Sequence, residues 1–359
     1  MEFLERAIAL AERGRGNTFP NPIVGAVLVK DGTIIGEGFH ERAGSEHAEI
    51  VALRRSAHAS AATLYVTLEP CAHHGRQPPC TDAIIAAGII RVVVGTMDPN
   101  PRTAGSGVAQ LRAAGIEVEI RNDARCRRLV EDFAVWITSK LPYVGLKMAS
   151  SLDGYVGAIP GTTHQLTGEA WFAALQTIRY GYQAVMVGAG TALVDDPLLT
   201  VRDGVRRVPF ARIIVAGSRA LPPSLRVFRL VRGYRRTIVV VADGAPAWVH
   251  ELREVADIVV SPGRDDEVDL PGALAVIRNE LSICSILCEG GPTLAGSLLA
   301  SRAVNRFYWV YAPTFLAGES AMPVLVPAKN ELSGTELKFD LVERFGEDVL
   351  LSGPIERSV

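Results

Sequence analysis

The sequence predicts a two-domain protein of the α/β class. Short apolar runs with strand character alternate with segments of helical periodicity along most of the 359 residues. This alternation predicts a mostly parallel sheet with helices on both faces. Hydrophobic residues make up 48% of the chain and charged residues 21%, an ordinary globular composition at a length that allows two cores. We place the boundary after residue 140, which gives domains 1–140 and 141–359.

The first domain begins with an amphipathic helix that we expect to end near Gly14. Two apolar runs around Lys30-Asp31-Gly32 then predict a β-hairpin. Helices and strands alternate after the hairpin, and the last helix bridges to the second domain. The expected helices are 2–14, 45–55, 81–87, 108–114 and 123–138, and the expected strands are 23–29, 33–38, 62–68, 89–95 and 116–120.

The second domain continues the alternation. One of its helices starts at Pro292, and proline is favoured in a first helical turn because that turn does not use its N–H groups. The expected strands are 143–148, 184–188, 212–216, 237–242, 258–260, 285–288 and 307–311, and the expected helices are 168–181 and 292–300.

Charge and hydropathy exclude several classes of protein. The formal net charge is −2, so no overall positive field draws the chain to nucleic acid or to an anionic membrane. No apolar stretch approaches the ~20 residues of a membrane span, and the first residues do not resemble a signal peptide, so we expect a cytoplasmic protein. Five cysteines in a long chain do not suggest a disulfide framework. We expect one basic run to lie on the solvated surface, and contact with a phosphate is the alternative. The run consists of Arg226, Arg229, Arg232, Arg235 and Arg236.

Two pieces of the first domain predict a catalytic zinc site. His47 and Glu49 form an H-x-E motif at the start of an expected helix, and Pro70-Cys71 follows a strand, with Cys80 nine residues further on. One histidine and two cysteines supply three zinc ligands and leave the fourth position for water, whose pKa the metal lowers. Glu49 is placed to carry a proton from that water to a departing ammonia, as in zinc deaminases.

The spacing of the two cysteines departs from the short P-C-x-x-C form of this signature. Eight residues separate Cys71 from Cys80, and they include His73 and His74. A closed structural site that uses one of these histidines as a fourth ligand is therefore an alternative, and the absence of any metal is another.

The long insert resembles the bifunctional riboflavin-biosynthesis deaminase/reductase family, in which it is the normal form. The similar strings are 20–25, 67–80 and 98–101, whereas 102–107 differs from the family pattern. The resemblance implies a cytidine-deaminase-like three-layer α/β/α domain, with zinc on the histidine and the two cysteines and Glu49 as proton shuttle. It also implies that a phosphoribosylaminopyrimidine substrate is surrounded by Asn21, His73, Arg76, Asp98 and Asn100. From the residues alone, an alternative is that Asn21, Asp98 and Asn100 are turn-forming residues beside proline.

The second domain lacks the glycine fingerprint of a Rossmann dinucleotide site. Gly188-Ala189-Gly190 follows a strand, but Leu193 stands where the third glycine belongs. A different signal is the turn Gly290-Gly291 between a strand and a helix, because a glycine turn and a helix N-terminus suit phosphate groups. An ordinary strand–helix turn is the alternative.

Three strings of this domain are similar to the reductase half of the same family, at 146–154, 187–191 and 195–202. The resemblance implies a dihydrofolate-reductase-like α/β domain that uses NADPH to reduce a ribosyl group, and a homo-oligomeric enzyme. The cofactor residues that it implies are Ala149, Thr191, Asp195, Gly291, Pro292, Thr293, Leu294 and Ser297. The substrate residues that it implies are Lys147, Arg179, Leu198, Arg202 and Glu289.

Five positions of the second domain depart from the family pattern, namely Gln165, Trp171, Gln176, Ala216 and Gly217. They leave open a deaminase whose C-terminal domain is impaired as a reductase, and a product that feeds another pathway. A nucleic-acid deaminase is disfavoured by the net charge, and a zinc-stabilised binding module without activity is the remaining alternative.

Overall fold

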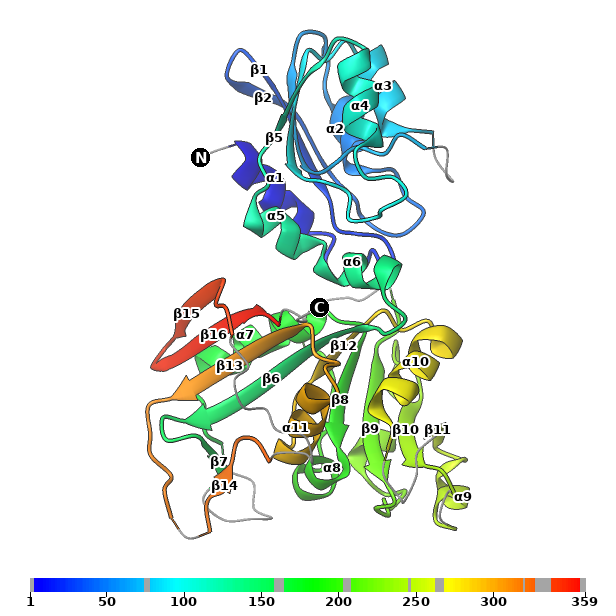
Figure 1. The fold of residues 1–359 in the computed structure, drawn as a ribbon, viewed down its shortest axis with the longest axis vertical. Coiled ribbons are helices and arrows are strands. Elements are labelled where there is room, and N and C mark those ends of the chain that lie inside the picture. The colour runs from blue at the N-terminus through cyan, green and yellow to red at the C-terminus, as the bar shows by residue number, and fades with distance from the viewer. Residues whose placement is uncertain are drawn as a thin grey trace. The chain divides into compact units, whose positions relative to one another are not determined.

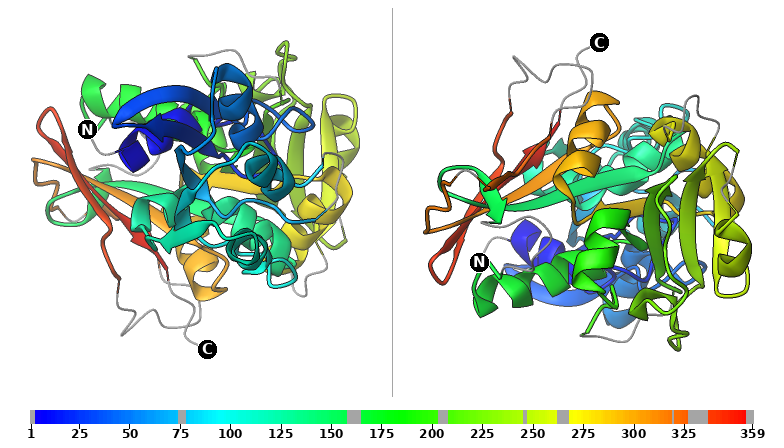
Figure 2. Two further views of the ribbon diagram at one scale, coloured as in Figure 1. Left: turned by 90° about the horizontal axis from the view of Figure 1, so that it is seen from above. Right: turned by 90° about the horizontal axis from the view of Figure 1, so that it is seen from below.

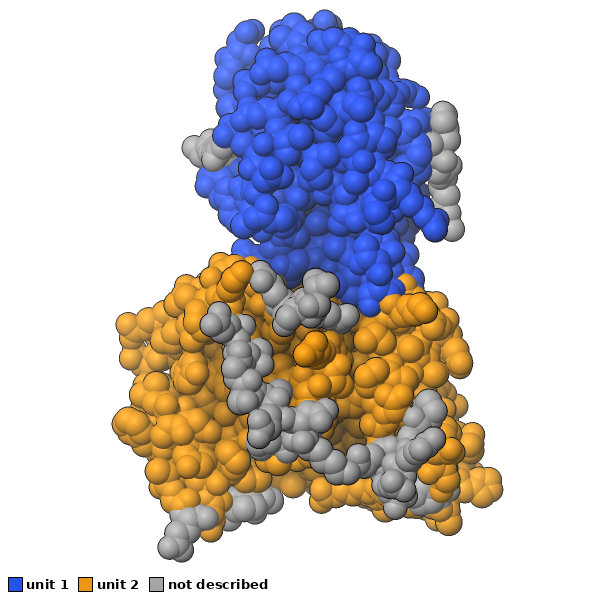
Figure 3. All heavy atoms as spheres, viewed as in Figure 1, with its two compact units in different colours: residues 1–139 blue, residues 140–359 orange. Residues whose placement is uncertain are grey.

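The computed structural model describes residues 3–73, 78–157, 165–202, 208–244, 247–261, 268–318, 320–326 and 337–355. The chain divides into two compact units, residues 1–139 and residues 140–359 (Figures 1 and 3). Each unit has its own sheet and its own hydrophobic core. Within the described ranges, every helix is too short or too polar to cross a membrane.

The first unit is built on a five-stranded sheet. Its spatial order is β2 (Thr33–Phe39), β1 (Gly25–Lys30), β3 (Thr63–Leu68), β4 (Arg91–Thr96) and β5 (Glu117–Ile120). Strand β1 runs antiparallel to both of its neighbours, and β3, β4 and β5 are parallel. The predicted hairpin and the predicted parallel strands are both present.

Helices cover both faces of this sheet (Figure 1). One face carries α2 (Ala48–Arg55), α3 (Cys80–Ala86) and α4 (Ser106–Ala113), and the other carries α1 (Phe3–Glu12) and α5 (Ala124–Leu129). Along β1, Ala26 and Leu28 pack into the first layer, and Val27 and Val29 into the second. A strand that is buried on both sides has a continuous run of apolar residues, and β1 has such a run. The predicted three-layer α/β/α arrangement is confirmed.

Two helices of the first unit differ from the sequence prediction by more than a shift of one or two residues at their ends. The expected helix 123–138 is broken into α5 and α6 (Glu131–Thr138), because the buried residue Val130 between them leaves the helical region with φ −119° and ψ 12°. The expected helix 45–55 begins only at Ala48, so His47 is its N-cap, with extended backbone.

The second unit contains a nine-stranded sheet (Figures 1 and 2). Its spatial order is β11 (Ala256–Ser261), β10 (Thr237–Ala242), β9 (Ala211–Gly217), β8 (Ala184–Gly188), β12 (Ser285–Cys288), β6 (Tyr143–Ser151), β13 (Arg306–Ala312), β16 (Asp348–Pro354) and β15 (Leu341–Phe345). The strands from β11 to β13 are parallel, and β16 and β15 form an antiparallel hairpin at the edge. A separate pair is formed by β7 (Tyr155–Gly157) and β14 (Met322–Pro323).

Helices also cover this sheet on two faces. One core contains α10 (Leu270–Leu281) and α11 (Pro292–Ala300), and the other contains α8 (Ala189–Asp195), α9 (Val249–Leu252) and the short 3₁₀ helix η1 (Arg226–Phe228). Helix α7 (Glu169–Tyr180) packs against the edge hairpin. The sequence prediction missed α8, α9, α10 and the edge hairpin.

Helix α2 lies directly on β2 because the strand carries glycine at the contact. A Cβ atom built on Gly38 would come within 2.2 Å of the Ala48 carbonyl oxygen, and one on Gly36 within 2.4 Å of that of Ala52. No real side chain tolerates such an approach, so glycine at these positions fixes the first turn of α2, which carries Glu49.

We predict that Gly38→Ala destabilises the first unit by about 1–3 kcal/mol, because the added methyl group pushes α2 away from β2. The measurement is the midpoint of thermal unfolding. Gly157→Ala is the control, since a Cβ there meets no atom of the described residues within 4 Å. Equal unfolding midpoints for the two variants would show that the close approach has no energetic weight.

Candidate active sites

Three separate segments of the first unit bring a histidine and two cysteines together. His47 precedes α2, Cys71 lies in the loop after β3, and Cys80 begins α3. The Nδ1 atom of His47 is 3.2 Å from the Cys80 Sγ atom and 3.6 Å from the Cys71 Sγ atom. The three ligand atoms all lie within 4.8 Å of one another. The parallel arrangement of β3 and β4 and the helices on one face of the sheet produce this cluster.

The cluster fits a zinc ion. Zinc–nitrogen and zinc–sulfur bonds at a tetrahedral angle separate nitrogen from sulfur by about 3.6 Å, close to the two distances found. Hydrogen bonding from Cys80 lowers the pKa of the Cys71 thiol to about 4, which favours the thiolate that a metal binds. Exposed His73 is not part of the cluster, so it does not close the site as a fourth ligand. His74 lies outside the described residues.

Glu49 lies beside this cluster without belonging to it. It stands in the first turn of α2, with 4% of its surface exposed. Its carboxyl group interacts with His47, Cys71 and Cys80, and burial raises its pKa. The position matches that of a proton carrier next to three metal ligands.

A buried histidine that the sequence analysis did not single out connects Asn21 to the cluster. The His40 ring lies edge-on to His47, with centroids 5.6 Å apart, and its Nδ1 atom is 3.1 Å from the Glu46 carbonyl oxygen. A carbonyl accepts only, so Nδ1 carries the hydrogen and Nε2 is left to accept from the Asn21 amide at 3.2 Å. Burial lowers the pKa of His40, which disfavours the charged ring. No spacing rule marks His40 in the sequence.

Glu69 was also missed, and it fixes the loop that carries Asp98. The buried carboxylate accepts backbone N–H groups from Asp98 at 3.1 Å, Gly105 at 3.0 Å and Val108 at 3.1 Å. A Cβ atom on Gly107 would lie 2.0 Å from the Pro70 carbonyl oxygen, so this loop and the start of α4 press directly on the loop that leads to Cys71.

Asp98 and Asn100 have the turn-forming contacts that their positions beside proline suggested. Asp98 accepts the Asn100 N–H at 2.9 Å and the Thr103 hydroxyl at 2.6 Å, and Asn100 accepts the Arg102 N–H at 3.1 Å. Both side chains remain half-buried. A contact with substrate stays a prediction for each of them, and Arg76 lies outside the described residues.

We predict that Glu69→Gln lowers the unfolding midpoint and raises the KM of the first unit for its substrate. The amide places an N–H donor where the carboxylate accepted one, and each unsatisfied buried group costs about 1–3 kcal/mol. Glu117→Gln, at a side chain that is 70% exposed, is the control. The role assigned to Glu69 is wrong if the two variants match in both measurements.

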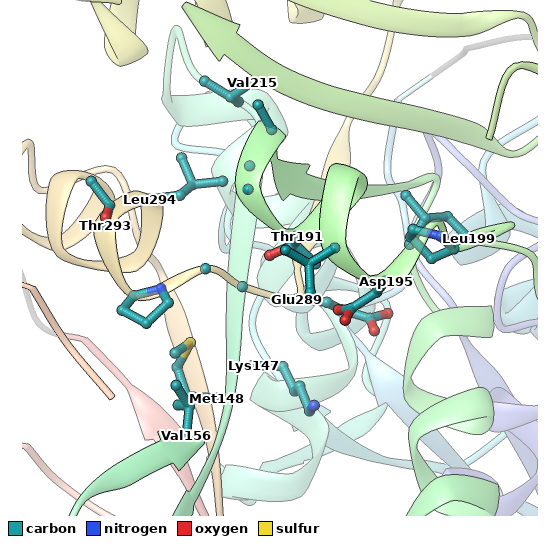
Figure 4. A pocket seen from close by; sticks show the side chains of 18 of the residues that line it. Lys147, Met148, Val156, Thr191, Asp195, Leu199, Val215, Glu289, Thr293 and Leu294 are labelled. Atoms are coloured by element: carbon teal, nitrogen blue, oxygen red, sulfur yellow. The ribbon is translucent and has the colours of Figure 1, made fainter. Parts of the chain in front are cut away.

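The second unit contains a cavity of about 1920 Å³ (Figure 4). It lies at the carboxyl ends of the parallel strands β6, β8, β9 and β12, the edge where ligands bind in open α/β sheets. Every residue that the family resemblance assigned to the cofactor or the substrate of this domain lines the cavity. Four of the five positions that we expect to depart from the family pattern line it as well: Gln165, Trp171, Ala216 and Gly217.

The glycine turn before α11 forms one wall of this cavity and fits a phosphate-bearing cofactor. Gly290 and Gly291 have φ angles of 117° and 95°, which side chains rarely adopt. A Cβ atom on Gly291 would come within 3.3 Å of the Thr191 hydroxyl, so the turn leaves a cradle for a ligand. The first turn of α11 begins at Pro292 and supplies free N–H groups and the positive end of the helix dipole.

Two cations and a carboxylate form one of the charged groups in the lining of the cavity. Arg179 binds Glu289 through two hydrogen bonds of 2.6 Å and 2.7 Å, and both side chains are about nine-tenths buried. Arg179 also donates to the Thr200 carbonyl at 2.6 Å. Burial lowers the pKa of Lys147, which Glu289 attracts and Arg179 repels. The three groups sum to one positive charge when Lys147 is protonated, which suits a phosphate.

Fold and sites together define a zinc deaminase joined to a nucleotide-dependent reductase. Residues 1–96 match the cytidine and deoxycytidylate deaminase zinc-binding region, and residues 142–351 match the RibD C-terminal domain. A riboflavin biosynthesis protein RibD from Actinobacillus pleuropneumoniae is 40% identical over 98% of this chain and 94% of its own length.

Solved structures give the same result over both units. RibD of Acinetobacter baumannii has a TM-score of 0.80 at 34% identity, covering 99% of this chain and 98% of that one. A Thermotoga maritima diaminohydroxyphosphoribosylaminopyrimidine deaminase/5-amino-6-(5-phosphoribosylamino)uracil reductase has a TM-score of 0.81 at 35% identity, covering 98% and 97%.

The chain belongs to the RibD family of riboflavin-biosynthesis proteins. It is a bifunctional enzyme, with zinc as the cofactor of its deaminase activity and NADPH as the cofactor of its reductase activity.

Proposed function

We propose that residues 1–140 deaminate 2,5-diamino-6-(5-phosphoribosylamino)pyrimidin-4(3H)-one, and that residues 141–359 reduce the ribosyl group of the resulting 5-amino-6-(5-phosphoribosylamino)uracil with NADPH. The observation that carries the first step is the His47, Cys71 and Cys80 cluster with Glu49 beside it. The cavity around the Arg179–Glu289 pair supports the second step. The substrates are those named for the Thermotoga maritima relative.

In the proposed deamination, Glu49 moves the proton. Zinc, when bound by His47, Cys71 and Cys80, makes a water molecule nucleophilic at neutral pH. The oxygen of water adds to the ring carbon that bears the exocyclic amine, and the bond from that carbon to nitrogen breaks. Glu49 takes a proton from the water and delivers it to the nitrogen, which leaves as ammonia. The net reaction is a hydrolysis and needs no oxidant.

The substrate contacts of the first unit are proposed from the family resemblance and, for the described residues, from the positions of the loops that carry them. Arg76 lies outside the described residues. We assign the pyrimidine and its phosphate to Asn21, His73, Arg76, Asp98 and Asn100. The link from Asn21 through His40 to the ligand His47, and the anchoring of Asp98 by Glu69, support two of these assignments.

Glu49→Gln tests the deaminase. We expect deamination to fall by about 10²–10⁴, because the amide does not transfer protons, while zinc content and NADPH-dependent reduction of supplied aminouracil stay at parental values. Ammonia release, metal analysis and nicotinamide absorbance are measured on one sample. Deamination at the parental rate in this variant rules out the proposed catalytic site.

For the reductase, the cavity divides into a cofactor wall and a substrate wall. We assign NADPH to the glycine turn, the first turns of α11 and the neighbouring positions on β6 and α8, namely Ala149, Thr191, Asp195, Gly291, Pro292, Thr293, Leu294 and Ser297. We assign the substrate to Lys147, Arg179, Leu198, Arg202 and Glu289. NADPH, when bound, supplies a hydride. The side chains bind and orient the substrate, and the cationic groups hold its phosphate.

The reductase is tested by adding the aminouracil and NADPH to the purified enzyme. We expect nicotinamide absorbance to fall, and we expect Lys147→Met to raise the KM for the aminouracil by about tenfold or more through loss of a charge-assisted contact. Deamination by the same variant is the internal control. If the parental enzyme deaminates but consumes no NADPH, the impaired-reductase hypothesis replaces this one.

We further propose that the enzyme is a cytoplasmic homo-oligomer, on the strength of its family membership. Sedimentation equilibrium of the purified chain measures the subunit number, and a monomer at micromolar concentration would contradict the proposed assembly.

A further inference from the structure

Residues 200–202 have no regular secondary structure, yet side chains from other elements of the second unit bind their backbone. The Tyr234 hydroxyl accepts the N–H of Val201 at 2.8 Å and donates to its carbonyl oxygen at 3.2 Å. On α7, the buried side chain of Gln176 accepts the N–H of Arg202 at 3.2 Å through its Oε1 atom. Segments outside helices and strands move most where such bonds are missing. These contacts therefore hold the backbone at the point where the Arg202 side chain begins.

The far end of the Arg202 side chain is also held by α7. Its guanidinium carbon lies 4.7 Å from the centre of the Phe172 ring, which is a cation–π distance. Phe172 stands four residues before Gln176, so the two side chains are neighbours on one face of the helix. Phe172 and Arg202 both line the cavity of the second unit. Helix α7 thus contacts Arg202 at two points, the backbone N–H and the guanidinium.

Arg202 brings to the cavity a positive charge that no described residue neutralises. Its guanidinium has neither an ion pair nor a hydrogen bond with the described residues, and the Phe172 ring is neutral. Arg179, another arginine of the cavity lining, differs because Glu289 binds it at 2.6 Å and 2.7 Å. A guanidinium that is held in position and has no acidic partner suits an anionic ligand, since little of its freedom is left to lose on binding.

We propose that Phe172 and Gln176 are positioning residues that aim Arg202 at the phosphate of the reductase substrate, and that they thereby set the preference of the site for the phosphorylated ribosyl compound. The inference rests on the proposed reductase function, which assigns Arg202 to the substrate. It adds two residues that act on the substrate only through Arg202. Orientation matters because a guanidinium binds a phosphate through two parallel N–H groups, and a freely rotating side chain seldom presents both.

The experiment measures the dissociation constants of 5-amino-6-(5-phosphoribosylamino)uracil and of its dephosphorylated form by isothermal titration. We expect the double variant Phe172→Leu/Gln176→Met to bind the phosphorylated compound about tenfold more weakly, because it loses a cation–π contact and a hydrogen bond, and to bind the dephosphorylated one like the parent. Phe172→Tyr keeps a ring beside the guanidinium and is expected to retain the parental affinity. Phe39→Leu is the matched control, since Arg13 lies 4.7 Å from the Phe39 ring and neither residue lines the cavity.

Two further variants show whether Phe172 and Gln176 act through Arg202. We expect Arg202→Met to weaken binding of the phosphorylated compound by about tenfold or more, through loss of a charge-assisted contact. The triple variant is expected to bind no more weakly than Arg202→Met alone, because the loss of a side chain also removes the effect of the residues that position it. The affinity for NADPH, which stays within about twofold of the parental value, shows that the second unit of each variant is folded.

Several results would overturn the inference: parental affinity in the double variant, an equal loss for the two compounds, additive losses in the triple variant, weakened binding of NADPH, or a parental enzyme that does not bind the phosphorylated compound. The titration does not depend on turnover. An enzyme that binds the phosphorylated compound through the positioned Arg202 but never oxidises NADPH would therefore contradict the proposed function and leave the inference standing. Reduction of the aminouracil by an enzyme whose Arg202→Met variant binds it like the parent would have the opposite meaning.

Discussion

The pairing of buried polar groups is the constraint on which both halves of this enzyme depend. Glu69 is a carboxylate in the interior of the first unit, and it is stable there because three backbone N–H groups point at it. Arg179 and Glu289 satisfy the same requirement in the second unit. Each arrangement ties together segments that are far apart in the sequence.

The two sites use one geometric principle with different chemistry. In parallel sheets the strands end at the same edge, so the loops that follow them meet. In the first unit, the loop after β3 carries Cys71, and the loop after β4 carries Asp98. In the second, the segments after β8 and β12 carry Thr191 and Glu289. The first site is built of soft sulfur and nitrogen ligands for a metal, and the second of a glycine turn and cations for phosphates.

Local signals predicted most of the elements that are buried on both sides, because continuous apolar runs and glycine or proline boundaries are readable without neighbours. The local signals failed where an element forms only through contacts with segments that are distant in the sequence. The edge strand β15 has mostly exposed side chains and forms by pairing with β16. Helix α10 was missed although Leu270, Ala273, Leu274 and Ile277 follow helical spacing and Pro271 stands in its first turn, so its signal was present. The break at Val130 follows from burial of that residue, which periodicity does not report.

The sequence by itself determined the chemistry of this protein, because metal ligands, a proton carrier and a glycine turn are residue types at short, readable spacings. His47, Glu49, Cys71 and Cys80 could be identified in this way. The cofactor and substrate residues of the second unit were implied only by the family resemblance. Only the tertiary structure decided which side chains support them. His40 and Glu69 act through partners that are distant in the sequence. Hydrogen bonds depend on position in space, and that is the information a linear pattern does not contain.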